Sequence, residues 1–600
     1  MARARHAALA ASLVLATGNC SRPGRSSALQ FDRAELVIPM RDGTRLFAVT
    51  LTPRHASGPL PILLERTPFG AQQELPNSDL PPMYRELAAD GYIFVVQDIR
   101  GRYRSGGTFV VNRPLADSGG VDESTDAYDT IDWLIHHLPD NNGKVGVLGS
   151  SYRGWLAAMA GIHPHPALKA ISPQAPTGDT WLGDDFYHQG AFRETQGVAF
   201  AAYVDGNRNP SVPDNDQYDF YLHQQTLTAI AKASGVGALP FWQALAAHPT
   251  DDEYWQSRAL QRIDTIASVP TLIVGGWWDP EDIFGPQALY QGMSKHDASG
   301  LVHIVLGPWW HNAWLGPRAD SVGPMALDSN TATWFRAAVQ RPWFAWYLHG
   351  IGDGHFAAAT LFESGANRWR ALEQWPPAEA KDRNIYLSAN GVLRFDSAAA
   401  TRSDDSGYLS YRSDPASPVP YLPHDRDGSG WQKWLMQDQQ FLGARRDLAT
   451  WTSAPLEHDV VIAGNVTAHL FASTSGTDAD WVVKLIDLFP DSGNARGYRL
   501  MVNADIVRGR YWKGFDHAVA IPSNRIIPFD VDLHQQYYRF VTGHRMMVEV
   551  QSSWFPLYDR NPQQFIDNIF DARPSDFQSA EQRIWHTRAA PSHLTLQLLP

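Results

Sequence analysis

The feature of this sequence that most constrains its fold is a serine at a sharp bend between a strand and a helix. The segment Gly149-Ser150-Ser151-Tyr152-Arg153-Gly154 follows the apolar run 145–148 and precedes the small-residue stretch 156–160. Strand, tight turn and helix in this order hold a serine hydroxyl exposed above an α/β sheet, and the glycines leave room where a Cβ would collide. The second glycine comes one residue later than in the pattern G-x-S-x-G, and an ordinary glycine-rich turn would look the same locally. The segment therefore predicts a nucleophilic Ser151 only if the rest of the chain supplies its partners.

Those partners are a histidine that takes the serine proton and a carboxylate that orients the histidine. Asp279 comes soon after the apolar run 271–275, and His311 comes soon after the run 302–306. In a doubly wound sheet, residues just past the strand ends gather at the ligand site, and α/β-hydrolases carry their triad in the chain order serine, acid, histidine. We therefore predict a catalytic triad of Ser151, His311 and Asp279.

The rest of the chain divides by its periodicity. From residue 28 to about 177, strand-like runs alternate with helical ones, which predicts a parallel α/β sheet. The alternation stops between 178 and 265, where helix-forming and aromatic residues predict a helical cap over the sheet, and then it resumes. Beyond about residue 370, short alternating runs between turns predict a β-sandwich or jelly roll. The predicted domains are a signal peptide (1–27), an α/β core in two parts (28–177 and 266–369), a helical cap (178–265) and a jelly-roll domain (370–600).

The N-terminus has the pattern of a signal peptide. Residues 1–5 are basic, and residues 7–17 form an apolar run that is too short to span a bilayer. We therefore expect a secreted or periplasmic bacterial protein. Cys20 suggests a lipid anchor, but Asn19 precedes it where a small residue is expected, so lipidation stays open. Because Cys20 is the only cysteine, the chain has no intrachain disulfide and no cysteine-based metal site.

The charge balance limits the partners. The chain has 50 basic and 63 acidic residues and a net charge of −13, which argues against nucleic acid or an anionic membrane surface. No later apolar run is long enough to span a membrane. There is no P-loop and no dinucleotide-binding glycine pattern between a strand and a helix, so we predict no cofactor and no metal. The expected partner is a small molecule, and the oligomeric state, a homo-oligomer included, stays open.

At three places the chain resembles the peptidase S15 superfamily of serine hydrolases, which includes cocaine esterase-like enzymes. These are Gly149-x-Ser151-Tyr152-x-Gly154, Trp278-Asp279 and Gly307-Pro308-Trp309-x-His311. Within this superfamily the chain most resembles the α-amino acid ester hydrolases, which cleave or transfer acyl groups that carry a free α-amine, including those of β-lactam antibiotics. The resemblance extends to Met40-Arg41-Asp42-Gly43, Asp98-x-Arg100-Gly101 and residues 552–562. It implies an α/β-hydrolase core, an inserted helical cap and a C-terminal jelly roll.

An acidic loop indicates which subfamily the chain resembles. Asp279, Glu281 and Asp282 place three carboxylates within four residues, which is unfavourable unless a cation lies nearby. In the amino acid ester hydrolases, carboxylates two and three residues after the catalytic acid, and an aspartate near the entry of the cap, bind the substrate ammonium. The resemblance implies these roles for Glu281, Asp282 and either Asp185 or Asp184, of which we prefer Asp185. A solvated acidic loop is the alternative.

The oxyanion hole departs from the family. There, the backbone N–H after the nucleophile, here that of Tyr152, acts together with the hydroxyl of a tyrosine in an Arg-Thr/Asn-Pro-Tyr loop. This chain has Arg66-Thr67-Pro68-Phe69, and Phe69 lacks the hydroxyl donor. Either another group donates to the oxyanion or the oxyanion is held less well.

The sequence therefore predicts a serine hydrolase that cleaves α-amino acid esters and β-lactam side-chain amides, or transfers their acyl groups, through an acyl-enzyme. One rival is an esterase or acylase of the same fold without amine recognition, for example one that cleaves glutaryl-cephalosporin side chains or aryl esters. Another rival is a catalytically impaired homologue that binds through its jelly roll.

Overall fold

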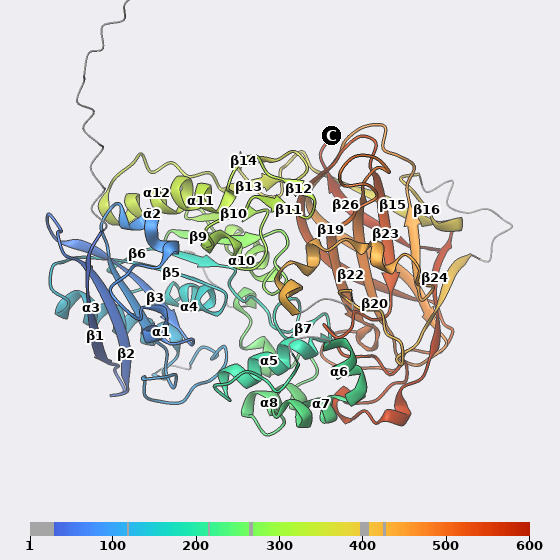
Figure 1. Cartoon of the computed structure of the whole chain (residues 1–600), viewed down its shortest axis with the longest axis horizontal. Helices are drawn as coiled ribbons and strands as arrows, with labels where there is room; N and C mark the ends of the chain where they lie inside the picture. Colours follow the sequence, from blue (N-terminus) through green and yellow to red (C-terminus); the bar gives the residue numbers. More distant parts are fainter. Residues whose placement is uncertain (1–28, 117–118, 214–216, 263–267, 397–406, 424–427) are drawn as a thin grey trace, which may run out of the picture.

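The computed structural model describes residues 29–116, 119–213, 217–262, 268–396, 407–423 and 428–600, so the predicted signal peptide and Cys20 lie outside it. In Figure 1 an α/β sheet lies on the left, an antiparallel β domain on the right, and the cap helices α5 to α8 below and between them. This arrangement confirms the predicted α/β-hydrolase core, inserted cap and β-rich C-terminal domain. Among the described residues, no helix is both long and apolar enough to cross a membrane.

The core is built on a ten-stranded sheet in the order β1-β2-β4-β3-β5-β6-β9-β10-β13-β14. From β4 to β13 in this order the strands run parallel, whereas β1, β2 and β14 pair antiparallel at the edges. Every residue of β4, β9 and β10 is buried, because helices cover both faces of a parallel sheet. The strands are β1 (Phe31–Pro39), β2 (Arg45–Pro53), β3 (Leu60–Thr67), β4 (Ile93–Asp98), β5 (Asn141–Ser150), β6 (Leu168–Gln174), β9 (Thr271–Gly276), β10 (Val302–Gly307), β13 (Ala359–Glu363) and β14 (Arg368–Leu372).

Helices pack on both faces of this sheet (Figure 1). The longest, α3, begins at a capping box in which Asp122 accepts hydrogen bonds from the backbone N–H groups of Ser124 and Thr125. The core helices are α1 (Ala71–Glu74), α2 (Arg85–Ala88), α3 (Glu123–His137), α4 (Tyr152–Ala160), α10 (Phe284–Ser294), α11 (Thr331–Phe335) and α12 (Arg341–Phe344), and a small hairpin is formed by β11 (Ser321–Val322) and β12 (Met325–Ala326).

The cap is the segment between β6 and β9, which contains the predicted range 178–265. Its aromatic side chains pack together, with the ring centroids of Phe186 and Phe241 4.7 Å apart. The same cluster includes Trp155 of α4 and Phe570 of the C-terminal domain, so the cap is held by both neighbours. The cap elements are β7 (Tyr187–His188), β8 (Ala191–Phe192), α5 (Glu194–Val204), α6 (Gln217–Gln224), α7 (Leu227–Ser234), α8 (Pro240–Ala247) and α9 (Glu253–Gln256).

The C-terminal domain is a twelve-stranded, mostly antiparallel sheet that begins after β14. Because β14 pairs with β13, it belongs to the core sheet and extends across position 370, where the sequence analysis divides the two domains. The strands are β15 (Lys381–Ser388), β16 (Val392–Arg394), β17 (Tyr408–Ser413), β18 (Leu448–Thr452), β19 (Val460–Thr474), β20 (Asp480–Leu488), β21 (Arg499–Arg508), β22 (Ile527–Phe540), β23 (Arg545–Gln551), β24 (Ala580–Thr587), β25 (Ala590–Pro591) and β26 (His593–Leu598).

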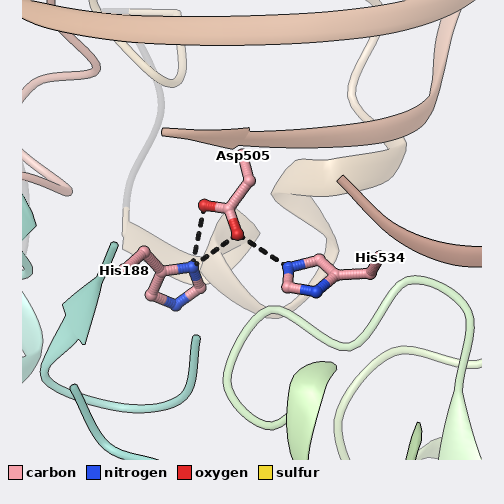
Figure 2. Close-up of side chains that lie close together, drawn as sticks. All are labelled: His188, Asp505 and His534. Atoms are coloured by element: carbon pink, nitrogen blue, oxygen red, sulfur yellow. Dashed lines mark hydrogen bonds and ion pairs between the residues drawn. The ribbon is translucent and has the colours of Figure 1, made fainter. Parts of the chain in front are cut away.

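A buried polar cluster joins the cap to this domain (Figure 2). Asp505 of β21 lies between two imidazoles, 2.9 Å from Nδ1 of His188 in β7 and 2.7 Å from Nε2 of His534 in β22. All three side chains are buried. The cluster therefore fixes the start of the cap against the second domain by charge-assisted hydrogen bonds.

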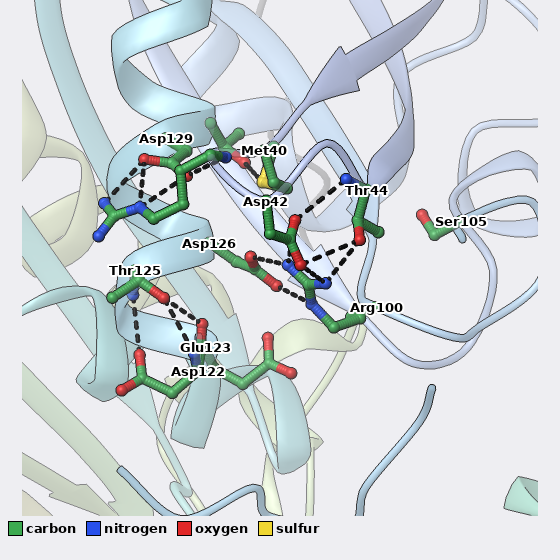
Figure 3. A network of polar contacts seen from close by, with 12 residues as sticks. Met40, Asp42, Thr44, Arg100, Ser105, Asp122, Glu123, Thr125, Asp126 and Asp129 are labelled. Carbon is green, nitrogen blue, oxygen red and sulfur yellow. Dashed lines mark hydrogen bonds and ion pairs between the residues drawn. The ribbon is translucent and has the colours of Figure 1, made fainter. Parts of the chain in front are cut away.

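A second network of ion pairs and hydrogen bonds involves the motifs at residues 40–43 and 98–101 (Figure 3). Arg100 lies between Asp42 and Asp126, with nitrogen–oxygen distances of 2.7 and 2.6 Å. The hydrogen bonds from Arg100 lower the pKa of Asp42 to about 2. These motifs therefore join the β1–β2 turn and the loop after β4 to helix α3, and their role is structural.

Candidate active site

The predicted nucleophile lies at the end of β5, where the chain turns into α4. Ser151 has a φ of +63°, a strained conformation for a residue with a side chain. A Cβ at Gly149 would collide with the carbonyl oxygen of Arg153, and a Cβ at Gly154 would collide with that of Gln174. The late second glycine is thus required where α4 crosses β6, and the turn presents Ser151 into a cavity.

The predicted acid and base meet beyond the ends of two neighbouring strands, β9 and β10. Nδ1 of His311 lies 3.0 Å from both carboxylate oxygens of Asp279. Asp279 also accepts hydrogen bonds from the backbone N–H groups of Glu281, at 2.9 Å, and Asp282, at 3.1 Å. These donors hold the Asp279 carboxylate in place, so it can fix the ring orientation of His311.

The other ring nitrogen of His311 faces a carboxylate rather than the serine. Its Nε2 lies 2.9 Å from Oε2 of Glu281, and within the described residues Ser151 and His311 share no hydrogen bond. Burial would lower the pKa of His311, but Asp279 and Glu281 outweigh it and raise this pKa well above its usual value. With a carboxylate facing each ring nitrogen, the charged imidazolium form of His311 is favoured.

The cavity in front of Ser151 has a volume of about 430 Å³. Its wall combines apolar and aromatic side chains, mostly from the cap, with two carboxylates at one side. The lining includes Phe69, Ser151, Asp185, Arg193, Gln196, Tyr203 and Glu281. A cavity of this size that combines apolar and aromatic walls with polar and charged groups is suited to a small molecule.

The four acidic side chains near this cavity differ in what they face. Asp185 lines the cavity, with Gln196 as a hydrogen-bond donor at 3.2 Å, and burial followed by the nearby Glu281 raises its pKa to about 7. Asp184 accepts hydrogen bonds from four backbone N–H groups, which join the entry of the cap to α10. The structure therefore brings Asp185 and Glu281 to the cavity and leaves Asp184 as a structural link.

Asp282 does not reach the cavity. Its side chain is fully buried, neither oxygen has a hydrogen-bond partner, and Oδ2 lies 3.8 Å from Nδ1 of His311. Burial, followed by the charge of Asp185, raises the pKa of Asp282 well above its usual value. The backbone N–H groups of both residues bind Asp279, but of the two side chains only that of Glu281 lines the cavity, while that of Asp282 is buried.

Arg193 is a cavity residue that the sequence analysis missed. Its guanidinium is buried, and Nη2 donates to the carbonyl oxygen of Pro280 at 2.7 Å, while Nε and Nη1 have no hydrogen-bond partner. The positive charge of Arg193 lowers the pKa of Asp185 and so offsets part of the increase that burial and Glu281 cause. Nothing in the local pattern around Arg193 marks it, because its position depends on how the cap folds back over the sheet.

The oxyanion side of the cavity contains Tyr152 and Phe69. Tyr152 is the first residue of α4, so its backbone N–H has no acceptor within the helix and is free to bind an anion. Phe69 follows β3 and lines the cavity, and its ring lies 5.8 Å from that of Tyr203 on cap helix α5. The tyrosine hydroxyl that the resemblance implies here is absent, as the sequence shows.

Two groups of side chains among the described residues lie close enough to hold a metal ion. They are His188, Asp505 and His534, and Glu281, Asp282 and His311, with ligand atoms within 4.8 Å of one another. In both groups the imidazoles already have carboxylate partners. We therefore explain both by ion pairing and assign no metal.

Comparison with known proteins relates both large domains to one family. Residues 42–313 match the family described as X-Pro dipeptidyl-peptidase (S15 family). Residues 343–595 match the family described as the X-Pro dipeptidyl-peptidase C-terminal non-catalytic domain. Cocaine esterase of Rhodococcus sp. (strain MB1 Bresler) is 30% identical over 596 residues, which cover 94% of this chain and 98% of the relative.

Two solved structures are similar over nearly the whole chain. An aminopeptidase from a marine sediment archaeon, Thaumarchaeota archaeon, has 38% identity and a TM-score of 0.91, and the match covers 98% of this chain and 99% of the other. An α-amino acid ester hydrolase has 36% identity and a TM-score of 0.91, and the match covers 97% of this chain and 99% of the other.

Proposed function

The chain belongs to the peptidase S15 family of hydrolases, and from this membership we propose that it cleaves esters and amides whose acyl group carries a free α-amine. The observation that carries the proposal is the pair of carboxylates, Asp185 and Glu281, in the cavity that contains Ser151. α-Amino acid esters and β-lactam side-chain amides are the substrate classes we expect.

In the proposed mechanism Ser151 attacks the substrate carbonyl while His311 takes its proton through Nε2. Asp279 orients His311 through Nδ1, and the N–H of Tyr152 binds the developing oxyanion. His311 then returns the proton to the leaving group, which departs and leaves an acyl-enzyme. Water or an acceptor amine then attacks the acyl-enzyme while His311 takes its proton, and His311 returns this proton to Oγ of Ser151 as the acyl group leaves the serine.

The substrate amine binds, in this proposal, as an ammonium between Asp185 and Glu281. Two carboxylates in a buried site repel each other unless cations lie close to them; in the empty site those cations are Arg193 and the imidazolium of His311, and the ammonium takes the place of the imidazolium beside Glu281. The aromatic cap residues around them suit an aromatic or aliphatic acyl side chain. The names of both solved relatives, aminopeptidase and α-amino acid ester hydrolase, denote enzymes whose substrates present an amino group.

The test uses two esters that differ only in the amine, phenylglycine methyl ester and phenylacetic acid methyl ester. We expect a higher kcat/KM for the amino ester. Asp185→Asn should raise KM for the amino ester by about 10- to 100-fold, the value of a charge-assisted hydrogen bond. The same variant should change KM for phenylacetate far less. Wild-type enzyme with equal kcat/KM for both esters would instead support the esterase without amine recognition, which the similarity to cocaine esterase favours.

Labelling by a fluorophosphonate tests the catalytically impaired alternative, because only an activated serine reacts. We expect Ser151→Ala to abolish labelling and Ser150→Ala to keep it, because Ser150 Oγ donates to Oδ1 of Asn312 at 2.5 Å. A wild-type protein that resists the label would point to a binding protein.

A further inference from the structure

The catalytic base is occupied by the residue proposed to bind the substrate amine. Nε2 of His311, the nitrogen that must accept the Ser151 proton, lies 2.9 Å from Oε2 of Glu281. Within the described chain, Ser151 makes only backbone hydrogen bonds, to Gln174 and from Trp155. An imidazole whose two nitrogens both face carboxylates is held as an imidazolium, and an imidazolium cannot act as a base.

The charged groups around His311 come from two elements. The loop after β9 contributes Asp279, Glu281 and Asp282, at 3.0, 2.9 and 3.8 Å from the ring nitrogens. The cap contributes Asp185, whose field also reaches His311. Of these four carboxylates, Glu281 alone contacts Nε2 of His311 and also lines the cavity. Glu281 is therefore the one that can give up its ion pair with His311 and pair with a ligand instead.

We propose that Glu281 controls the catalytic base, pairing with His311 in the empty site and releasing it when the substrate ammonium enters. The proposal rests on the proposed amine recognition. The ammonium replaces the imidazolium as the partner of Glu281, the proton on Nε2 passes to solvent, and the neutral nitrogen becomes available to Ser151. A substrate without the amine leaves the ion pair intact. The amine therefore acts on kcat as well as on KM, and Glu281 is a positioning residue that determines specificity.

The decisive measurement is the pH dependence of kcat/KM for the amine-free ester, phenylacetic acid methyl ester, in wild type and Glu281→Gln. An opposite charge within a few ångströms typically shifts a pKa by about 1–3 units. Removing the charge should therefore move the acid limb of the profile down by about 1–3 pH units. On that limb the variant should cleave phenylacetate at least about tenfold faster than wild type, while its kcat/KM for the phenylglycine ester falls. Glu253→Gln, at an exposed position of cap helix α9, is the matched control and should move neither profile.

The outcomes separate the two proposals. If Glu281→Gln loses activity only on the amino ester and the phenylacetate profile stays in place, Glu281 binds the amine without controlling His311, and this inference is overturned while the proposed function stands. A loss on both esters with an unmoved acid limb would mean a structural role and would also overturn it; equal thermal midpoints of variant and wild type show that the comparison concerns folded protein. A wild type without amine preference removes the proposed function and the inference together.

Discussion

Phe69 is the residue at which this chain departs most clearly from the enzymes it resembles. It lines the cavity with Ser151, and Tyr203 of the cap lies against its ring. Loss of one oxyanion donor typically costs on the order of 10²–10³ in kcat. We therefore expect Phe69→Tyr to raise kcat on the amino ester with little change in KM, because the donor acts on the transition state. Phe69→Leu, which adds no donor, is the control. A Phe69→Tyr enzyme that is no faster than wild type, at unchanged thermal stability, would mean that another donor already serves the oxyanion.

At the scale of elements, the crossing of α4 over β6 sets the position of the nucleophile. Gly154 lies at the crossing, where any Cβ would meet the backbone of Gln174, and neither backbone can yield without moving the turn. Gly154→Ala should therefore lower the free energy of unfolding by about 1–3 kcal/mol and reduce kcat by about 10²-fold, since a displaced nucleophile loses its alignment. Gly292→Ala in α10 is a suitable control, because a Cβ there meets no atom within 4 Å. It should be neutral or stabilise the helix by up to about 1 kcal/mol. Denaturant titration measures the free energy of unfolding of each variant, and ester kinetics measure its kcat. An active, stable Gly154→Ala protein would contradict the steric argument.

At the scale of the whole molecule, the cluster in Figure 2 makes the association of cap and C-terminal domain depend on pH. Burial would lower the pKa of His534, but the hydrogen bond to Asp505 outweighs it and raises this pKa to about 9. Because the folded pKa lies above the ordinary value of about 6.5, the stabilisation is complete below about pH 6.5 and is lost as the pH rises through about 9. His534→Gln, which cannot carry the charge, should therefore be less stable than wild type by up to about 3 kcal/mol near pH 6 and should approach it near pH 10. Thermal denaturation across this range measures the difference. A difference that does not vary with pH would show that His534 contributes packing rather than charge.

Local chemistry made much of this molecule predictable from its sequence. Strand, turn and helix at Ser151, and the positions of Asp279 and His311 just past β9 and β10, follow from apolar periodicity and chain order, which act over a few residues. The same reasoning predicted the α/β core, the cap and the β-rich C-terminal domain. The division at position 370 falls inside β14 (Arg368–Leu372), because this strand is assigned by its pairing with β13 and not by its own residues.

Only the tertiary structure decided what the charged side chains face. Asp184 and Asp185 are neighbours of the same type, yet backbone N–H groups from α10 bind the first and leave the second in the cavity. Asp282 turned inward, Arg193 reached the site from the cap, and Glu281 paired with His311. Each outcome depends on atoms that are distant in sequence, since burial and charge set the environment of a carboxylate and come from whichever elements pack around it. The sequence determined which groups are present at the site, and the packing of the core, the cap and the C-terminal domain determined their partners.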